Sequence, residues 1–382
     1  MREVVIVEAV RTPVGKRKGL LSNERPDELA AKVLKEVVAR AGISPGQVED
    51  VILGCVAQVE EQSLNIARTA ALMAGFPIEV PGTTIDRQCG SGQQAVHFAA
   101  QAILSGDMDI VIAGGVESMT RVPMGSSRKN SRWSEMLTSQ YEMIHQGLSA
   151  ERIAKEWDLS REELDEFSLE SHRRAILAQD EGRFDREIMP LEVTLEDGTT
   201  LKVTQDEGPR RETSLEKLAA LKPAFTEDGK IHAGNSSQMS DGAAALLLMS
   251  RDKAEELGLK PRFRIVARTV VGSDPTLMLT GPIEASKRVL NRAGLSIHDM
   301  DTYEVNEAFA PVPMVWLREL EADPEKLNPN GGAIALGHPL GASGARLMIT
   351  MMHELERTNG RYGLQAICEG GGMANATIIE RL

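Results

Sequence analysis

Residues 40–44 read RAGIS, and a near-copy, RAGLS, returns 252 residues later at 292–296. In both places a helical segment precedes the pattern, and a polar-rich stretch leads from it into a strand, at 51–54 in the first copy and 303–306 in the second. A pentapeptide can recur by chance. The matching order of elements on both sides nevertheless favours duplication of one α/β unit.

Strand and helix patterns alternate around the first copy. A chain of 382 residues exceeds what one hydrophobic core supports, so we expect at least two packing units. The alternation predicts layered α/β domains. Strands are expected at 2–10, 50–57, 80–85 and 109–114 and helices at 27–41, 65–74 and 93–104, followed later by a strand at 242–249, a helix at 251–257 and a strand at 265–271 that echoes 6–10.

The middle of the chain, residues 119–238, has a different character. It is polar, and its long charged helical region is interrupted at Ser160, which forms a capping box with Glu163. A hairpin is expected at 191–203, around residues 196–198. We interpret the segment as an excursion that covers the core. The predicted domains are 1–118 together with 239–261, the inserted loop domain 119–238, and 262–382.

Charge and cysteine content narrow the class of protein. A net charge of −13 argues against a general nucleic-acid or anionic-membrane surface, so an anionic ligand would need a local basic patch. Such a patch is present within 119–238, although charge runs are often only solvated faces. Its members are Arg210, Arg211, Lys217 and Lys222.

Three cysteines do not form a disulfide framework, and no cysteine or histidine cluster has metal-ligand spacing. The N-terminus starts directly with a strand pattern, and no apolar run reaches the ~18 residues of a membrane span. We therefore expect a cytoplasmic protein without a metal site.

One of these cysteines, Cys89, lies in the polar turn 86–92, between a strand and a helix. Free backbone N–H groups and the helix dipole at such a turn favour a thiolate and can bind a developing oxyanion. The alternative is a buried structural cysteine, which is common. A helix terminus contributes ~0.3–1 kcal/mol, and one pKa unit is ~1.4 kcal/mol, so the dipole alone leaves the thiol mostly protonated. Cys89 therefore needs a base.

The duplication supplies a candidate for that base. Equivalent turns meet across the pseudo-two-fold axis of a duplicated fold, and residues 330–344 take the place in the second half that the Cys89 turn has in the first. Within them, His338 is flanked by glycines and proline on a rigid turn, which favours a functional role over a structural one. Two further polar clusters lie at element ends, at 306–309 and 368–372.

These motifs resemble those of the thiolase family, which includes acetyl-CoA acetyltransferases and 3-ketoacyl-CoA thiolases. The resemblance runs from VVIVEAVRTP at 4–13 to the last residue, and NEAFA at 306–310 and GGAIALGHPLGASG at 331–344 are its most specific parts. It implies a five-layered α/β/α/β/α thiolase fold of two duplicated halves with an inserted loop domain. It also implies assembly as a homodimer or homotetramer.

The resemblance also implies roles for individual residues. Cys89 would be the acyl-accepting nucleophile, His338 its base and Cys368 the acid and base for the second substrate. Asn306 would hold a catalytic water, and the N–H groups of Cys89 and Gly370 would form an oxyanion hole. Coenzyme A would be a substrate and product rather than a bound cofactor, contacted by Arg210, Lys217, Leu221, Ala224, Phe225, Ala233, Ser237, His145 and Phe309, with Gln146 and Met278 at the acyl pocket.

The implied reaction is ping-pong thiolysis of a 3-ketoacyl-CoA, or the reverse Claisen condensation. Two alternatives remain: a ketoacyl-synthase-type condensing enzyme, and a non-catalytic acyl-CoA or lipid carrier. Cys368 argues against the first, and retention of all four polar residues argues against the second. Gln146 replaces a methionine of short-chain enzymes, and burying its amide unpaired costs ~1–3 kcal/mol, which favours a wetter pocket and acyl chains longer than four carbons.

Overall fold

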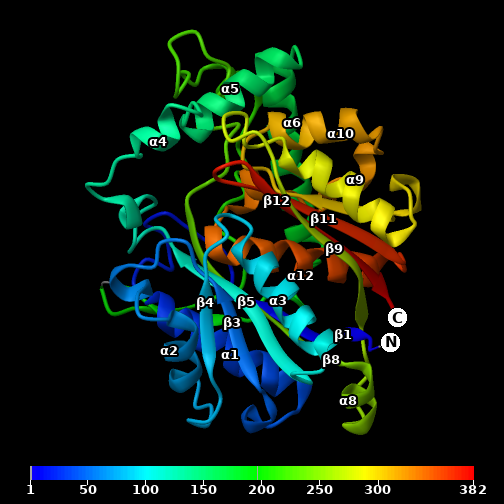
Figure 1. The fold of residues 1–382 in the computed structure, drawn as a ribbon. Coiled ribbons are helices and arrows are strands. Elements are labelled where there is room, and N and C mark those ends of the chain that lie inside the picture. Colours follow the sequence, from blue (N-terminus) through cyan, green and yellow to red (C-terminus); the bar gives the residue numbers. More distant parts are fainter. Residues whose placement is uncertain (1, 196) are drawn as a thin grey trace.

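A computed structural model of the chain describes residues 2–195 and 197–382 (Figure 1). The first half forms a sheet of strand order β4-β3-β5-β8-β1. Strands β3, β4 and β5 run parallel, whereas β8 runs antiparallel to both of its neighbours, β5 and β1. The strands are β1 (Val4–Arg11), β3 (Asp50–Gly54), β4 (Gly82–Ile85), β5 (Ile110–Ser118) and β8 (Ser240–Ser250).

The second half repeats this arrangement in the order β10-β11-β12-β9. Its first two strands are parallel and the others antiparallel, as in the first half. Where β4 would lie, Leu327 makes a single parallel bridge to Tyr303. A short pairing of β1 with β9 joins the two halves into one sheet. The strands are β9 (Phe263–Gly272), β10 (Thr302–Val305), β11 (Tyr362–Glu369) and β12 (Met373–Arg381).

Helices form the remaining three layers (Figure 1). One pair lies between the two halves of the sheet, and each outer face is covered by another pair. One apolar core surrounds the inner pair, and a further core lies under each outer pair. The predicted five-layered α/β/α/β/α fold is thus confirmed. The inner helices are α3 (Ser91–Ser105) and α12 (Leu340–Thr358), and the outer helices are α1 (Pro26–Ala41), α2 (Ile66–Met73), α9 (Gly281–Ala293) and α10 (Pro311–Leu320).

The repeated pentapeptide ends the same helix in each half. Gly42 and Gly294 follow α1 and α9 with φ values of 70° and 67°, the left-handed conformation in which glycine has no steric penalty. The serine two residues later starts a short 3₁₀ turn with a capping box, at Pro45–Gln47 and at Ile297–Asp299. The pattern is therefore a helix stop followed by a turn into the next strand.

The inserted segment carries helices and a hairpin outside the sheet (Figure 1). The capping box of Ser160 and Glu163 is present at the start of α6, and the expected hairpin is β6 with β7, although Glu196 lies outside the described residues. The three-part domain division stays a prediction. These elements are α4 (Glu135–Thr138), α5 (Gln146–Glu156), α6 (Arg161–Asp180), β6 (Leu191–Thr194), β7 (Thr200–Val203) and α7 (Leu215–Ala219); β2 (Gly15–Lys16), α8 (Arg251–Glu256) and α11 (Ala333–Leu336) complete the elements used below.

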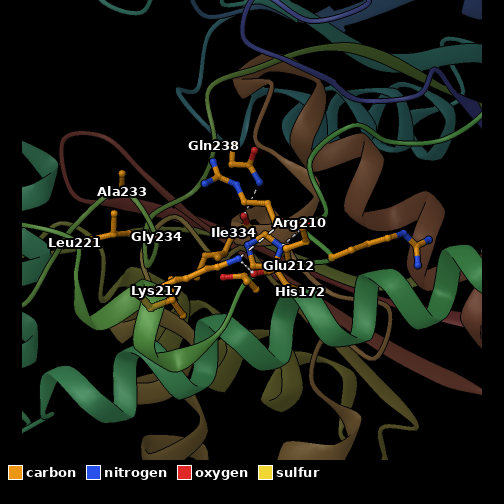
Figure 2. A pocket seen from close by; sticks show the side chains of 12 residues that line it. His172, Arg210, Glu212, Lys217, Leu221, Ala233, Gly234, Gln238 and Ile334 are labelled. Atoms are coloured by element: carbon orange, nitrogen blue, oxygen red, sulfur yellow. Dashed lines mark hydrogen bonds and ion pairs between the residues drawn. The ribbon is translucent and has the colours of Figure 1, made fainter.

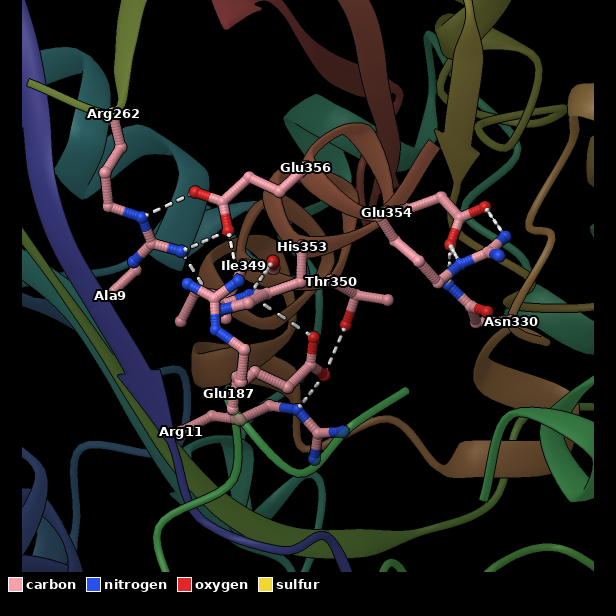
Figure 3. Close-up of polar contacts among 12 residues, drawn as sticks. Ala9, Arg11, Glu187, Arg262, Asn330, Ile349, Thr350, His353, Glu354 and Glu356 are labelled. Carbon is pink, nitrogen blue, oxygen red and sulfur yellow. Dashed lines mark hydrogen bonds and ion pairs between the residues drawn. The ribbon is translucent and has the colours of Figure 1, made fainter. Parts of the chain in front are cut away.

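A buried polar network fixes the inner helix α12 to its surroundings (Figure 3). Glu187 accepts hydrogen bonds from the Arg11 guanidinium at 2.7 Å and from the Thr350 hydroxyl at 2.9 Å. Further along α12, Glu356 accepts from Arg262 at 2.8 Å. Removing one partner would leave a buried charge uncompensated, so the network holds α12 in one position. Among the described residues, no helix is both long and apolar enough to cross a membrane.

Candidate active site

The turns that carry Cys89 and His338 lie beside each other because the helices that follow them meet at their first turns. A Cβ on Gly92 would lie 2.8 Å from the Gly341 carbonyl oxygen, and one on Gly344 would lie 2.3 Å from the Gln93 nitrogen. Only glycine permits this approach of α3 to α12. Both turns therefore open on the same space, as the duplication predicts.

Cys89 is buried beside Met119 and Leu340. Burial, with a smaller contribution from the Glu369 carboxyl, raises the pKa of Cys89 to about 12, whereas backbone N–H groups of Cys89 itself and of Gly370 lower it. The sequence favoured a thiolate at this helix start, but burial outweighs the dipole, so the resting group is a thiol. The two N–H groups directed at its sulfur are the pair expected for an oxyanion hole.

His338 is a neutral base with a fixed tautomer. Ser343 donates its single hydroxyl hydrogen to the Pro339 carbonyl at 2.8 Å, so at 2.6 Å it must accept from His338 Nδ1–H. The lone pair of His338 is consequently on Nε2. Burial, with a smaller effect of the Arg346 charge, lowers the pKa of His338 to about 3, so the ring is uncharged at neutral pH.

Two further polar residues lie at or just after strand ends of the second half. Asn306 comes directly after β10, and its Nδ2 lies 3.4 Å from His338 Nε2. Cys368 lies near the end of β11, where burial and then the charge of Cys89 raise its pKa. The structure thus places Asn306 beside His338, and Cys368 near Cys89.

A cavity of about 410 Å³ lies over α6 and α7 (Figure 2). Two of its cations are engaged, because Arg211 pairs with Asp180 at 2.6 Å and Lys217 donates to the Glu212 carbonyl. Arg210 makes no ion pair within residues 2–195 and 197–382. The predicted coenzyme A contacts that line this cavity are Arg210, Lys217, Leu221 and Ala233.

A second cavity, of about 530 Å³, connects with the first and leads to His338. The two share Arg210, Ala233 and Gln238, and Gln238 is held by its amide, which donates to the carbonyl groups of Gly208 and Ile334. It contains the remaining predicted contacts, which are His145, Gln146, Ala224, Phe225, Ser237 and Phe309.

Aromatic stacking builds the cover of this second cavity. His145 caps α5 by accepting from the Gly147 N–H at 3.1 Å, and its ring stacks on Phe225 at 5.2 Å between centroids. Phe225 in turn meets the edge of Phe309. Met278 is buried in the apolar cluster with Cys368 and lines neither cavity, so its place at the acyl pocket stays a prediction.

The structure adds functional residues that the sequence analysis missed. Ser343 sets the tautomer of His338, and its position one helical turn past the histidine is the only sequence signal for it. Glu117, at the end of β5, accepts from the Val56 and Gly341 N–H groups, both at 2.9 Å, and so ties the start of α12 to the first half. Lys16 and Arg17 line the second cavity, and their only signal was a run of three cations, residues 16–18, in an acidic chain.

Comparison with known proteins identifies the family. Residues 4–252 match the thiolase N-terminal domain, and residues 259–381 match the thiolase C-terminal domain. The chain belongs to the thiolase family. The prediction of a thiolase enzyme is confirmed, and neither a carrier nor a ketoacyl-synthase-type enzyme is favoured.

Individual relatives match along the full chain. It is 50% identical to a steroid 3-ketoacyl-CoA thiolase of Mycobacterium tuberculosis, over 100% of this chain and 95% of the relative. It is 47% identical to a 3-oxoadipyl-CoA/3-oxo-5,6-dehydrosuberyl-CoA thiolase of Escherichia coli, over 100% of both. The crystal structure of the Bacillus anthracis acetyl-CoA acetyltransferase superposes with a TM-score of 0.92 at 42% identity, covering 100% of this chain and 99% of that one.

Proposed function

We propose that this thiolase cleaves 3-ketoacyl-CoA with coenzyme A to give acetyl-CoA and a shortened acyl-CoA, and that the same residues run the reverse condensation. The observation that carries the proposal is the meeting of a buried thiol, a neutral imidazole whose lone pair is on Nε2, and a second buried thiol, with the imidazole lining the second cavity. A nucleophile, a base and an acid in this arrangement are sufficient for acyl transfer.

In the first half-reaction, the Cys89 thiol gives its proton to His338 Nε2 as its sulfur attacks the keto carbon. The Cys89 and Gly370 N–H groups stabilise the oxyanion of the acyl-enzyme stage, while Asn306 and His338 hold the second oxyanion site. The bond between the α-carbon and the keto carbon breaks, and its electron pair passes to the α-carbon. That carbon takes the proton of Cys368, so acetyl-CoA leaves and Cys89 carries the acyl group.

In the second half-reaction, coenzyme A enters the position that acetyl-CoA has left. The Cys368 thiolate removes the proton of the coenzyme A thiol, whose sulfur attacks the acyl carbonyl. The bond to Cys89 breaks, and Cys89 recovers its proton from His338. Both catalytic cysteines and the histidine are then restored, as a ping-pong cycle requires.

Coenzyme A would lie with its nucleotide in the first cavity and its pantetheine arm in the second. Arg210 supports this orientation, because it lines both cavities, makes no ion pair within the part of the chain that the structure describes, and can meet a phosphate. Coenzyme A is then a substrate, and no permanently bound cofactor is required. Gln146 lines the second cavity half-exposed, with no hydrogen bond of its amide inside the described part of the chain, which supports acyl chains longer than four carbons.

Assembly and location also stay proposals. The inserted segment exposes large apolar side chains, including Trp133 and Met136, whose exposed fractions are 47% and 77%. A homodimer or homotetramer would cover them, and light scattering of the purified chain measures its mass. All three cysteines are free, which suits a reducing compartment.

Acylation of Cys89 tests the proposed function. Incubation with an acyl-CoA should add one acyl mass per chain, which peptide mass spectrometry should locate on Cys89. The Cys89→Ala variant should fold, keep coenzyme A binding and lose turnover by several orders of magnitude. Near-normal turnover by this variant would reject the function.

Arg210→Ala tests the coenzyme A orientation. A charge-assisted contact contributes ~1.5–3 kcal/mol, so the KM for coenzyme A should rise about tenfold or more while kcat changes little. The effect should disappear with pantetheine substrates, which lack the nucleotide. Lys222→Ala is the matched control, because Lys222 belongs to the same basic segment but lines neither cavity. An equal loss with pantetheine would show that Arg210 only stabilises the fold.

A further inference from the structure

One buried carboxyl group beside the catalytic cysteines takes no part in the proposed reaction. Glu369 is the last residue of β11, between Cys368 and Gly370, and its exposed fraction is 0%. A Cβ on Gly90, the residue that follows Cys89, would overlap Glu369 Oε1, so the carboxyl lies directly against the Cys89 turn. Two segments that are distant in the chain thus meet at the side chain of Glu369.

This packing lies next to both N–H groups of the proposed oxyanion hole. The Gly370 N–H belongs to the peptide bond that follows Glu369, and Cys89 precedes Gly90 in the turn. A Cβ on Gly370 would lie 3.1 Å from Gln88 Oε1, so the end of β11 contacts the turn at a second point. The contact of Glu369 with Gly90 therefore helps to set the separation of the two N–H groups, on which binding of an oxyanion depends.

The surroundings of Glu369 favour its uncharged form. Neither of its carboxyl oxygens has a hydrogen-bond partner within residues 2–195 and 197–382. A buried carboxylate without a donor is costly, so such a group keeps its proton instead. Two charged side chains of the Cys89 turn face it. Burial, opposed by the charge of Arg87 and supported by that of Asp86, raises the pKa of Glu369 to about 9.

A charge on Glu369 would oppose the chemistry at Cys89. Acylation places negative charge on an oxyanion at the Cys89 and Gly370 N–H groups, and the positive end of α3, which begins at Ser91, lies at the same turn. A carboxylate beside Gly90 would repel that oxyanion and would itself occupy the positive helix end. After burial, the charge of Glu369 is also the next cause that raises the pKa of Cys89.

We propose that Glu369 is a positioning residue for acylation: its uncharged carboxyl holds the Cys89 turn against the end of β11, and its ionisation opposes the oxyanion and slows acylation. This inference rests on the proposed thiolase reaction at Cys89. The proton of Glu369 stays on the carboxyl throughout the cycle, because His338 and Cys368 carry the protons of the two half-reactions. Glu369 therefore acts through the position and the electrostatic surroundings of Cys89.

The pH dependence of acylation tests the effect of the charge. The rate constant for acylation of Cys89 by an acyl-CoA can be measured in single turnovers by quenching and mass spectrometry. In the wild type it should fall about tenfold as the pH passes the pKa of Glu369, because a neighbouring like charge shifts an ionisation by about one unit or more. The fall should be absent from Glu369→Gln, whose amide has a similar shape but cannot ionise. The pKa of His338 is about 3, so this base adds no second transition in the same range.

The packing role is tested at neutral pH. Glu369→Ala removes the contact with Gly90, so acylation should slow by up to about 100-fold, as expected when reacting groups lose their position. Glu369→Gln should recover most of this rate, because the amide fills the same space. The affinity for coenzyme A should not change in either variant, since Glu369 lines neither cavity.

Two neighbours of Glu369 provide a second, independent measurement. Because the charge of Arg87 lowers the pKa of Glu369 and that of Asp86 raises it, Arg87→Gln should move the fall in acylation to higher pH, and Asp86→Asn should move it to lower pH. A carboxyl that only stabilises the fold would show neither shift. Glu79→Gln is the control, because it removes an exposed carboxylate and should keep the wild-type profile.

The outcomes distinguish this inference from the proposed function. Wild-type acylation without a fall, or the same fall in Glu369→Gln, overturns the inference, and so do equal rates for Glu369→Ala and Glu369→Gln at neutral pH. If the Glu369 variants do not fold, unmoved profiles in both Arg87→Gln and Asp86→Asn overturn it. Cys89 is still acylated in each of these cases, so the thiolase function stands. Absence of acylation of the wild type at every pH rejects the proposed function itself.

Discussion

The two halves of the molecule share one architecture but supply different chemistry. The turns before α3 and α12 occupy equivalent places and carry Cys89 and His338. The ends of the equivalent strands differ more. With the 252-residue offset of the repeat, Asn306 is the equivalent of Gly54. The strand registers likewise make Cys368 the equivalent of Val116. In the proposed reaction, the first half thus contributes the nucleophile, while the second contributes most of the groups that transfer protons.

A pair of glutamates shows how the same position acquires two roles. Glu117 and Glu369 end the equivalent strands β5 and β11, and burial raises the pKa of both. Glu117 accepts four hydrogen bonds, from the Val56, Ala57 and Gly341 N–H groups and from the Gln62 amide. Both oxygens of Glu369 make no hydrogen bond within the described residues, and its pKa is raised to about 9. Duplication therefore copies the backbone, and local partners decide the chemistry.

The sharpest test of the difference between the halves is Cys368→Ala. It removes the thiol from β11, so that this strand, like β5 at the equivalent position, carries no group that can transfer a proton. Cys89 should still be acylated by acyl-CoA, because its base is His338. Thiolysis and condensation should nearly stop, because the α-carbon has lost its acid and base. Mass spectrometry of the acyl-enzyme and steady-state rates measure the two steps. Loss of acylation as well would contradict this division of labour.

The second test removes the tautomer control that only the second half has. In Ser343→Ala, His338 loses the acceptor for its Nδ1–H, and a misplaced general base costs much of its ~10²–10⁴-fold contribution. We expect kcat to fall ~10–100-fold with an unchanged KM for coenzyme A, since Ser343 lines neither cavity. A parallel rise in KM would show that Ser343 acts on the shape of the binding site instead.

Glu117→Gln addresses the anchoring role of the first-half glutamate. In this variant an NH₂ group, which donates, replaces one carboxylate oxygen of Glu117, and the carboxylate accepts from four donors. Each buried donor that loses its acceptor costs ~1–3 kcal/mol. The free energy of unfolding in urea should fall by about that amount. Glu369→Gln should change it much less at pH 6, because Glu369 has no donors to lose. Equal destabilisation by both variants would remove the distinction between the two positions.

A further test concerns the pH dependence of stability that Glu369 adds. Its pKa is about 9 in the folded chain and near 4.5 when unfolded, so the folded state binds more protons between these values. The resulting stability is complete below pH 4.5 and is lost as the pH rises toward 9. Between pH 6 and pH 9, Glu369→Gln should therefore lose less stability than the wild type. Identical slopes would show that Glu369 is charged in the fold.

Much of the scaffold is encoded in neighbouring residues. The helix ends before Gly42 and Gly294, the capping box at Ser160 and the strands of the first half depend on contacts within a few positions, and the sequence predicted them. It gave no expectation for β11 and β12. The catalytic motifs could be recognised for the same reason, since each is a short turn. The repeat then indicated that Cys89 and His338 face each other, although only the contact of Gly92 with Gly341 shows how.

What the sequence by itself determined was the duplicated α/β architecture, and it also supplied the residues that the proposed reaction uses. The tertiary structure alone decided their protonation, because burial raises the pKa of Cys89 where the local helix dipole would lower it. It also decided the tautomer of His338, the separate roles of Glu117 and Glu369, and the position of Arg17 in the cavity. These properties depend on desolvation and on partners distant in the chain, and a residue's neighbours in sequence specify neither.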